Sequence, residues 1–338
     1  MVNAPPSFLG SLSALESFDN TPIIGTTFPN KSVQLSKLLT APNSDELIKD
    51  LATLVSHRGV VFFSDQDLTM EQQKELGTRL GELAGKPKTS TLHIHPISEE
   101  TPELGADISV ISSKGGIARP EARLTSTRAS RGWHSDITFE PVPSDYAILK
   151  MHTIPKVGGD TLWASGYEAY DRLSPAYQKF LEGLTAVHHA DVFIEYAARN
   201  GIKMHQNRGS PENTGTHLTA IHPVIRTHPL TGFKSLFVNR EFTKRIVELS
   251  PEESDNVLQF LQLHISENHD LQVRYRWNTN DVAIWDNRAT FHTATNDYGD
   301  ELRQGNRVVS IGEKPYFDPN SKSRRVVLGD PRQVVPDL

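Results

Sequence analysis

Cysteine is absent from this 338-residue chain. Without thiols the protein can form no disulfide framework, and the thiolate ligands of common structural zinc sites are excluded. Long apolar runs are missing as well: no stretch of about 18 apolar residues could span a bilayer, and residues 1–30 lack the basic and apolar regions of a secretion signal. We therefore expect a cytoplasmic protein with no membrane partner.

The chain also lacks an excess of positive charge. Its 35 lysines and arginines are outnumbered by 41 acidic residues, which gives a formal net charge of −6 at pH 7. Nucleic-acid-binding domains usually carry a basic patch, so we expect no nucleic-acid partner. Any preference for an anionic ligand must come from a few local side chains.

The organisation of the chain is simple. It contains no internal repeat and no low-complexity tract, and 37% of its residues are hydrophobic, which is enough for a sizeable buried core. We expect residues 1–20 to form an N-terminal arm and residues 21–338 to form a single domain. The sequence leaves the oligomeric state open, with a homo-oligomer among the alternatives.

Hydrophobic periodicity predicts several short strands together with a few amphipathic helices. Ser44 is the expected N-cap of the first helix, and Ser250 with Glu253 forms a capping box before a later one. This mixture predicts a sheet-rich α+β core. The expected helices cover residues 44–55, 70–83, 167–184 and 251–263, and the expected strands cover residues 59–63, 107–112, 271–277, 281–285 and 307–311.

Two segments carry no apolar periodicity. Residues 113–132, inserted within the domain, contain glycines, serines and several arginines. A loop of this length inside a compact domain is usually functional or disordered, so a mobile lid and an unstructured insertion are equally good interpretations. Residues 188–220 are rich in His, Asn, Gly, Ser and Thr, and we expect them to form a loop as well.

The candidate chemistry of the chain lies in His134 and Asp136, which share one motif, and in the distant His292. Side chains at positions i and i+2 of an extended segment point to the same face, so His134 and Asp136 can bind one metal together. Two imidazoles and one carboxylate suit a non-heme iron(II) site that keeps coordination positions open. The His-x-Asp pair alone is weak evidence, because such short motifs often arise by chance.

Two arginines follow His292 and lie four positions apart, Arg303 and Arg307. This spacing keeps their side chains on one face whether the backbone is extended or helical, so both can point into one pocket. The alternative is a pair of surface cations beside a turn, because residues 304–306 have the composition of a turn.

Four other histidines must be weighed as metal ligands. His93 and His95 have the same i, i+2 spacing and form a rival pair, although no carboxylate lies beside them and Pro96 ends the strand. His188 and His189 are adjacent, so in an extended chain they point to opposite faces and are poorly placed to share a metal. Packing or surface roles suit these last two better.

The residues that flank the metal motifs are open to two interpretations each. Trp133 and Trp285 could stack on a cofactor, but large aromatic residues beside a site more often belong to the core that fixes the ligand side chains. Asp286 and Asn287 could orient the ligands or form a turn.

Taken together, these motifs resemble the taurine dioxygenase (TauD/TfdA) family of Fe(II)- and 2-oxoglutarate-dependent dioxygenases, and the likeness is closest to its sulfonate-oxidising members. The resemblance covers roughly residues 20–316 and is specific, because several separate blocks occur in the family's order. It implies a double-stranded β-helix, or jelly-roll, core flanked by helices. The blocks are residues 59–63, 93–96, 134–139, 158–163, 222–229 and 285–292, followed by Arg303 and Arg307.

The resemblance implies the cofactor site residue by residue. It makes His134, Asp136 and His292 the iron(II) ligands. It places Thr161 and Arg303 on the distal carboxylate of 2-oxoglutarate, and it makes dioxygen the second cosubstrate.

The resemblance also implies a substrate site. It assigns Arg307, His95 and the backbone of Ile137 to the anionic group of the substrate, with Phe242 on the pocket wall. Ser98 departs from the pattern, since the taurine enzyme has an aromatic hydroxyl at the matching position. This departure leaves the identity of the substrate open.

The implied reaction is hydroxylation of a small anionic substrate, with 2-oxoglutarate and dioxygen converted to succinate and carbon dioxide. From an alkyl sulfonate such as taurine, the hydroxylated product would release sulfite and an aldehyde. Arg307 would accept a carboxylate, a sulfate ester or a phosphonate equally well. From other classes, the fold could serve as a zinc-binding hydrolase or as an anion-binding jelly-roll module, although neither explains a second arginine placed for a dicarboxylate.

Overall fold

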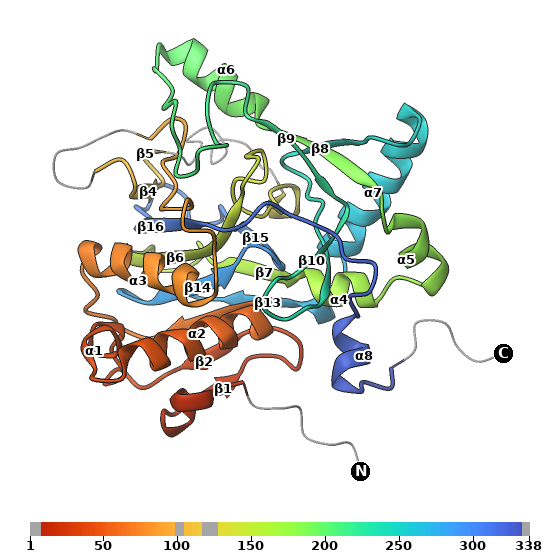
Figure 1. Ribbon diagram of the computed structural model, residues 1–338. Helices are drawn as coiled ribbons and strands as arrows, with labels where there is room; N and C mark the ends of the chain where they lie inside the picture. The colour runs from red at the N-terminus through yellow and green to blue at the C-terminus, as the bar shows by residue number, and fades with distance from the viewer. Residues whose placement is uncertain (1–7, 99–104, 117–127, 333–338) are drawn as a thin grey trace.

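The computed structural model describes residues 8–98, 105–116 and 128–332, and within them the largest element is an eight-stranded sheet (Figure 1). Its strands lie in the order β1-β2-β3-β14-β6-β16-β4-β5, and neighbouring strands are antiparallel except for β2 and β3. The strands are β1 (Phe18–Asp19), β2 (Thr26–Phe28), β3 (Val60–Phe63), β4 (Ser109–Ser112), β5 (Gly115–Gly116), β6 (Ser144–Thr153), β14 (Val282–Asp286) and β16 (Gln304–Ile311).

Three smaller sheets accompany it in the described residues. The sheet that concerns the site has the order β13-β7-β15 and consists of β13 (Gln272–Tyr275), β7 (Thr161–Ser165) and β15 (Thr290–Ala294). The others are β12-β8-β9 and β10-β11, formed by β12 (Thr243–Ile246), β8 (Thr185–His189), β9 (Thr219–Pro223), β10 (Ile225–Thr227) and β11 (Lys234–Leu236). With the helices described below, this is an α+β fold, as predicted.

The core lies on both faces of the large sheet. In β3, Val61 and Phe63 belong to a cluster shared with helices on one side, while Val60 and Phe62 belong to a cluster on the other side that includes Trp163 of β7. Alternate residues of a strand point to opposite faces, so this continuous apolar run is what a strand buried on both faces requires. The two sheets thus enclose one apolar layer between them.

Helices cover the face of the large sheet that is turned away from the β13-β7-β15 sheet, and further helices lie at the opposite end of the molecule (Figure 1). The N-terminal group, drawn in red and orange, packs on strands β3, β6, β14 and β16. It comprises the 3-10 helix η1 (Gly10–Ala14), α1 (Leu35–Thr40), α2 (Ser44–Arg58) and α3 (Met70–Leu83). The remaining helices are η3 (Ala129–Arg131), α4 (Gly166–Asp171), α5 (Pro175–Leu181), α6 (Asp191–Asn200), α7 (Pro251–Ser266), η4 (His269–Leu271) and α8 (Arg324–Leu328).

Several sequence-based predictions are confirmed. The helix expected over residues 70–83 is α3 with the same bounds, and the capping box of Ser250 and Glu253 opens α7. The expected cap of α2 is wrong by one position: Asn43 precedes the helix without a side-chain capping bond, and the Ser44 hydroxyl instead accepts a bond from Arg79.

Two segments differ from the prediction. The single helix expected over residues 167–184 is two helices, because Ser174 caps a new one and Pro175 occupies its first position, where a proline is well tolerated. The loop expected over residues 188–220 contains helix α6 and the first residues of β9.

The predicted arm and lid lie partly outside the described residues. Residues 8–19 form η1 and β1, and Leu12 is fully buried against α2, whereas residues 1–7 are outside the described part. Of the loop 113–132, the flanks form β5 and η3, and residues 117–127 are outside the described part. No helix in the described residues is long and apolar enough to cross a membrane.

Candidate functional site

His134, Asp136 and His292 come together at the β15 edge of the β13-β7-β15 sheet. His134 and His292 form an isolated antiparallel bridge in which each backbone N–H donates to the other's carbonyl, at 3.0 and 2.7 Å. The Nε2 atoms of both rings lie 3.9 Å from Asp136 Oδ1, and one donor atom from each residue falls within 4.8 Å of the others. The three residues predicted as metal ligands are therefore neighbours. His292 comes from strand β15, to which His134 is joined by the bridge.

The hydrogen bonds of His134 fix which ring nitrogen can bind a metal. Its Nδ1 donates to the carbonyl of Gly132 at 2.7 Å, which leaves Nε2, the ring nitrogen that faces Asp136, as the atom that can bind a metal. Burial lowers the pKa of His292 to about 3, which keeps that ring neutral. The neutral His292 ring is thus in the form that a metal requires.

Asp136 is held as a carboxylate inside the protein. Burial by itself raises its pKa, but the positive charge of Arg307, together with the two histidines, outweighs burial and lowers the pKa to about 2. The guanidinium Nη1 of Arg307 lies 2.5 Å from Asp136 Oδ1. A buried carboxylate that stays ionised is a good ligand for a hard divalent cation.

Asn287 holds Asp136 in position through its side-chain amide. Its Oδ1 accepts the backbone N–H of Asp136 and the indole N–H of Trp285, both at 3.0 Å, and its Nδ2 lies 3.4 Å from Asp136 Oδ2. Asp286 points elsewhere and bonds to His228 and Arg288. Of the two residues with open roles, Asn287 therefore orients the site and Asp286 joins a buried ion network.

The two flanking tryptophans are core residues. Trp133 is buried in the apolar cluster beside helices α4 and α7. Trp285 is buried between the sheets, and its ring lies 5.0 Å from that of His292. Both positions suit a packing role that restricts the ligand side chains.

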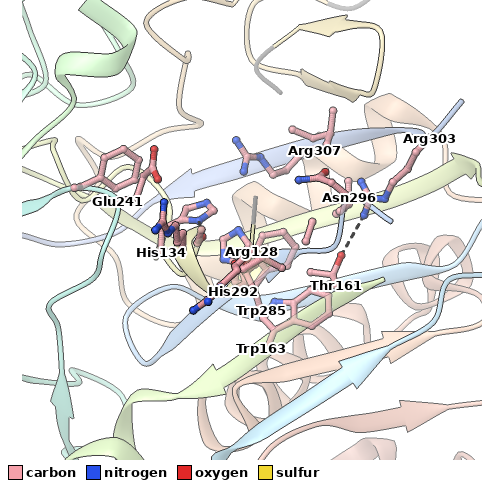
Figure 2. A pocket seen from close by; sticks show the side chains of 18 of the residues that line it. Arg128, His134, Thr161, Trp163, Glu241, Trp285, His292, Asn296, Arg303 and Arg307 are labelled. Atoms are coloured by element: carbon pink, nitrogen blue, oxygen red, sulfur yellow. Dashed lines mark hydrogen bonds between the residues drawn. The ribbon is translucent and has the colours of Figure 1, made fainter. Parts of the chain in front are cut away.

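A cavity of about 510 Å³ opens onto His134 and His292. Figure 2 shows Thr161 and Arg303 on one side of it, joined by a hydrogen bond from Arg303 Nη2 to Thr161 Oγ1 at 3.1 Å. The Nε of Arg303 donates to the carbonyl of Gly159 at 2.8 Å, and the indole of Trp277 donates to Thr161 Oγ1 at 3.0 Å. Since Thr161 Oγ1 already accepts two bonds, its own proton is available for a ligand.

Arg303 and Arg307 both line this cavity, so the alternative of two surface cations is wrong. Both side chains are at least nine-tenths buried, at 6% and 8% exposure. Residues 304–306 do not form a turn, because they are the first residues of strand β16. Arg303 directly precedes β16 and Arg307 lies within it, and both side chains reach the same cavity although the register of the strand shifts between Gln304 and Gly305.

The predicted substrate residues are only partly gathered at the cavity. Phe242 lines it, with its ring 6.0 Å from that of His134. His95 and Ile137 are buried close by, but neither is among the described residues that line the cavity. Burial holds the pKa of His95 well below its usual value, and the ring packs edge-on against Phe193 at 4.6 Å.

The backbone of Ile137 is strained. Its φ of +51° is rare for a β-branched residue, and within the described part of the chain its N–H has no acceptor. An unpaired N–H beside Asp136 is a donor that an anionic ligand could use.

A buried ion cluster lies next to the turn formed by residues 136–139. Glu140 is fully buried and receives bonds from Arg208, at 2.5 and 2.9 Å, and lies 3.2 Å from His93 Nε2. His93 is therefore engaged with Glu140, and the described residues place no metal-binding cluster at the rival His93–His95 pair. His188 is fully buried and His189 is half-buried and bonded to Thr219, so they face different ways, as expected.

Several cavity residues were missed from the sequence. Phe193 comes from helix α6, in a segment expected to be a loop, although Asp191 in the first turn and Gly201 after the last residue were usable helix signals. Arg128 and Arg131 also line the cavity, and they belong to the loop 113–132 that we considered as a lid. Glu241 and Asn296 carry no comparable local signal, because only the fold brings them to the cavity.

Comparison with known proteins gives consistent matches along the chain. A family model described as "Taurine catabolism dioxygenase TauD, TfdA family" matches residues 20–309. The chain is 47% identical to "Alpha-ketoglutarate-dependent dioxygenase btcD" of Neocamarosporium betae, over 96% of this chain and 98% of that protein. It is 35% identical to "Alpha-ketoglutarate-dependent sulfonate dioxygenase" of Saccharomyces cerevisiae, over 86% of this chain and 67% of that protein.

A solved structure shares the fold. The crystal structure of a taurine dioxygenase from Burkholderia xenovorans matches with a TM-score of 0.69 and 28% identity, covering 91% of this chain and 92% of that one. We expected the likeness to be greatest to sulfonate-oxidising members. The Saccharomyces cerevisiae protein named for sulfonates, at 35% identity, is more distant than the Neocamarosporium betae protein, at 47% identity, whose name states no substrate.

Proposed function

We propose, because this chain belongs to the taurine catabolism dioxygenase (TauD, TfdA) family, that His134, Asp136 and His292 hold the iron(II) of an α-ketoglutarate-dependent dioxygenase. The observation that carries this assignment is the convergence of the three donor atoms within 4.8 Å. The donor set fits the metal, since two imidazoles and one carboxylate leave positions free for other ligands.

The cosubstrate would lie with its distal carboxylate on Arg303 and Thr161. The guanidinium is buried, is fixed by Gly159 and Thr161, and keeps donors for a bidentate contact. When bound, the iron supplies oxidative chemistry with 2-oxoglutarate and dioxygen, which become succinate and carbon dioxide. The protein's own residues supply binding, orientation and shielding from water.

The substrate would be an anion held by Arg307, with His95 and the Ile137 amide as further contacts and Phe242 on the wall. The buried, planar guanidinium of Arg307 suits a tetrahedral or planar anion. An alkyl sulfonate such as taurine is the first candidate, with sulfite and an aldehyde as products, because some relatives are named for sulfonates. A carboxylate, a sulfate ester or a phosphonate is the alternative within the same chemistry.

We also propose that the facing sheets form the double-stranded β-helix expected from the resemblance. Support comes from the antiparallel pairing of β15 with β7 and of β14 with β6, in two sheets whose facing side chains share one apolar cluster. A zinc-binding hydrolase or a simple anion-binding module is less well supported, because neither accounts for a second buried arginine in the cavity.

One experiment tests the proposed function. Purified protein is titrated with iron(II) and 2-oxoglutarate without oxygen, and we expect a visible charge-transfer band. Oxygen is then admitted with a panel of small anions, and succinate and sulfite are measured. Bound zinc with no absorption change on adding 2-oxoglutarate would contradict the assignment.

A further inference from the structure

Among the three proposed metal ligands, His134 is the one that packing holds least. Its side chain is 26% exposed, whereas those of His292 and Asp136 are 9% and 3% exposed. The His292 ring lies 5.0 Å from the buried ring of Trp285, and Asn287 bonds to Asp136. A partly exposed ring needs a hydrogen bond to hold its rotamer and its tautomer.

That hydrogen bond ends beside the short helix η3. His134 Nδ1 donates to the carbonyl of Gly132 at 2.7 Å, and Gly132 directly follows η3. No residue of η3 is buried, and the bond that closes it runs from the Gly132 N–H to the carbonyl of Ala129 at 2.9 Å. A single 3-10 turn has poor hydrogen-bond geometry and little stability of its own. The carbonyl that orients His134 therefore needs an anchor outside η3.

Thr293 supplies that anchor. It lies on β15 directly after His292, is 4% exposed, and its hydroxyl donates to the carbonyl of Ala129 at 2.6 Å. The carbonyl of Ala129 thus accepts two bonds, one from Gly132 and one from Thr293. A Cβ atom at position 132 would lie 3.0 Å from Thr293 Oγ1, so the backbone of Gly132 packs directly on Thr293. A continuous path of contacts leads from Thr293 to the His134 ring.

We propose that Thr293 is a positioning residue for the metal site: through the backbone of η3 and Gly132, its hydroxyl fixes the His134 ring with Nδ1 protonated and Nε2 free to bind the metal. Strand β15 then serves the site twice, because His292 is a ligand and the next residue orients the ligand on the other side of the bridge. This inference rests on the proposed function, since it concerns one of the proposed iron ligands.

The test compares Thr293→Val and Thr293→Ser with the unchanged protein. Valine is similar in shape but lacks the hydroxyl, and serine keeps it. Iron(II) affinity is measured without oxygen by competition with a chelator, with no 2-oxoglutarate or substrate present. One lost hydrogen bond corresponds to about 2- to 10-fold in an equilibrium constant, so Thr293→Val should weaken iron(II) binding by that factor. Thr293→Ser should restore the affinity to within about twofold of the unchanged protein.

A spectroscopic readout separates positioning from a simple loss of stability. In cobalt(II)-loaded protein the N–H proton of each coordinated histidine is shifted far from the other signals, and its exchange with water is followed by NMR. The His134 proton is bonded to Gly132, so it should exchange about 2- to 10-fold faster in Thr293→Val. His292 Nδ1 is buried with no hydrogen-bond partner among the described residues, so its proton should exchange at an unchanged rate.

Thr295→Val is the matched control. Thr295 follows the end of β15, and its hydroxyl also bonds to a backbone carbonyl, that of Asp160 at 3.4 Å. This bond does not involve η3, and Thr295 does not line the cavity. The control should leave the iron(II) affinity and both exchange rates unchanged.

The results distinguish the inference from the proposed function. Unchanged iron(II) affinity in Thr293→Val, an equal loss in Thr293→Ser, or a loss without faster exchange of the His134 proton would overturn the inference and leave the proposed function standing. If the unchanged protein binds neither iron(II) nor cobalt(II), the proposed function is contradicted and the inference falls with it.

Discussion

Replacing Arg303 with alanine is the sharpest test of the cosubstrate site. A guanidinium carries five N–H donors. In Arg303 the Nε–H donates to the carbonyl of Gly159, and one Nη2–H donates to Thr161 Oγ1. The two N–H groups of Nη1 and the second of Nη2 remain, and one from each nitrogen can form a parallel pair of bonds with a carboxylate.

The magnitude follows from that pair. A hydrogen bond to a charged group contributes about 1.5–3 kcal/mol, so two give at least about 3 kcal/mol. Since about 1.4 kcal/mol corresponds to tenfold in affinity, Arg303→Ala should weaken 2-oxoglutarate binding about a hundredfold. Arg303→Lys keeps the charge but loses the planar fork, so its loss should be smaller.

The assay is an anaerobic titration of the iron(II)-loaded protein with 2-oxoglutarate, followed by the charge-transfer band and by calorimetry. Arg172→Ala is the matched control, because Arg172 is also partly buried and bonded to Glu168, but it does not line the cavity. An unchanged dissociation constant in Arg303→Ala would remove Arg303 from the proposed role.

Three further predictions concern the surroundings of the metal ligands. Asn287→Ala removes the support of Asp136, so iron(II) affinity should fall about 10- to 100-fold in competition with a chelator, and an unaltered affinity would show that Asn287 is dispensable. Glu140→Gln leaves the buried cation of Arg208 unpaired, so the free energy of unfolding in urea should fall by about 3–5 kcal/mol, and an unchanged value would contradict the buried ion pair. Burial lowers the pKa of His222 from its usual value of 6.5 to about 4, so its neutral form contributes stability that is present above pH 6.5 and is lost as the pH falls towards 4. Replacing His222 with Gln should flatten the unfolding free energy across that window by up to about 3 kcal/mol, and an equally steep profile in the variant would refute this.

The convergence of His134, Asp136 and His292 could be anticipated from two sources. The i, i+2 spacing predicts that His134 and Asp136 lie together, and the family resemblance adds His292. Spacing of i and i+2 puts His134 and Asp136 together wherever the chain is extended. Nothing local tells that His292 pairs with His134, since the bridge between them joins distant parts of the chain. The resemblance provided that contact, and it also gave the order in which Arg303 and Arg307 follow.

The contribution of α6 to the cavity was not anticipated. Residues 188–220 as a whole are rich in His, Asn, Gly, Ser and Thr, and this composition hid the short, more apolar stretch Asp191–Asn200 whose Phe193 lines the cavity. Asn287 was recognised as a candidate, but its contact with Asp136 depends on the close packing of Trp285 and Ser144 around its amide. Such contacts are tertiary, and hydrophobic periodicity carries no information about them.

The position of Asp136 depends on contacts that come from far along the chain. The next residue, Ile137, has a φ of +51°, and a β-branched residue held there costs on the order of 1–3 kcal/mol. Bonds to Thr138 oppose that strain: His222 Nε2 donates to its carbonyl at 2.9 Å, and Asn239 Nδ2 donates to its hydroxyl at 3.0 Å. His222 lies on β9 and Asn239 precedes β12, so the small sheet formed by β12, β8 and β9 contributes to holding this turn. Disturbing the small sheet should therefore displace the carboxylate, even though no residue of that sheet is among the three proposed ligands.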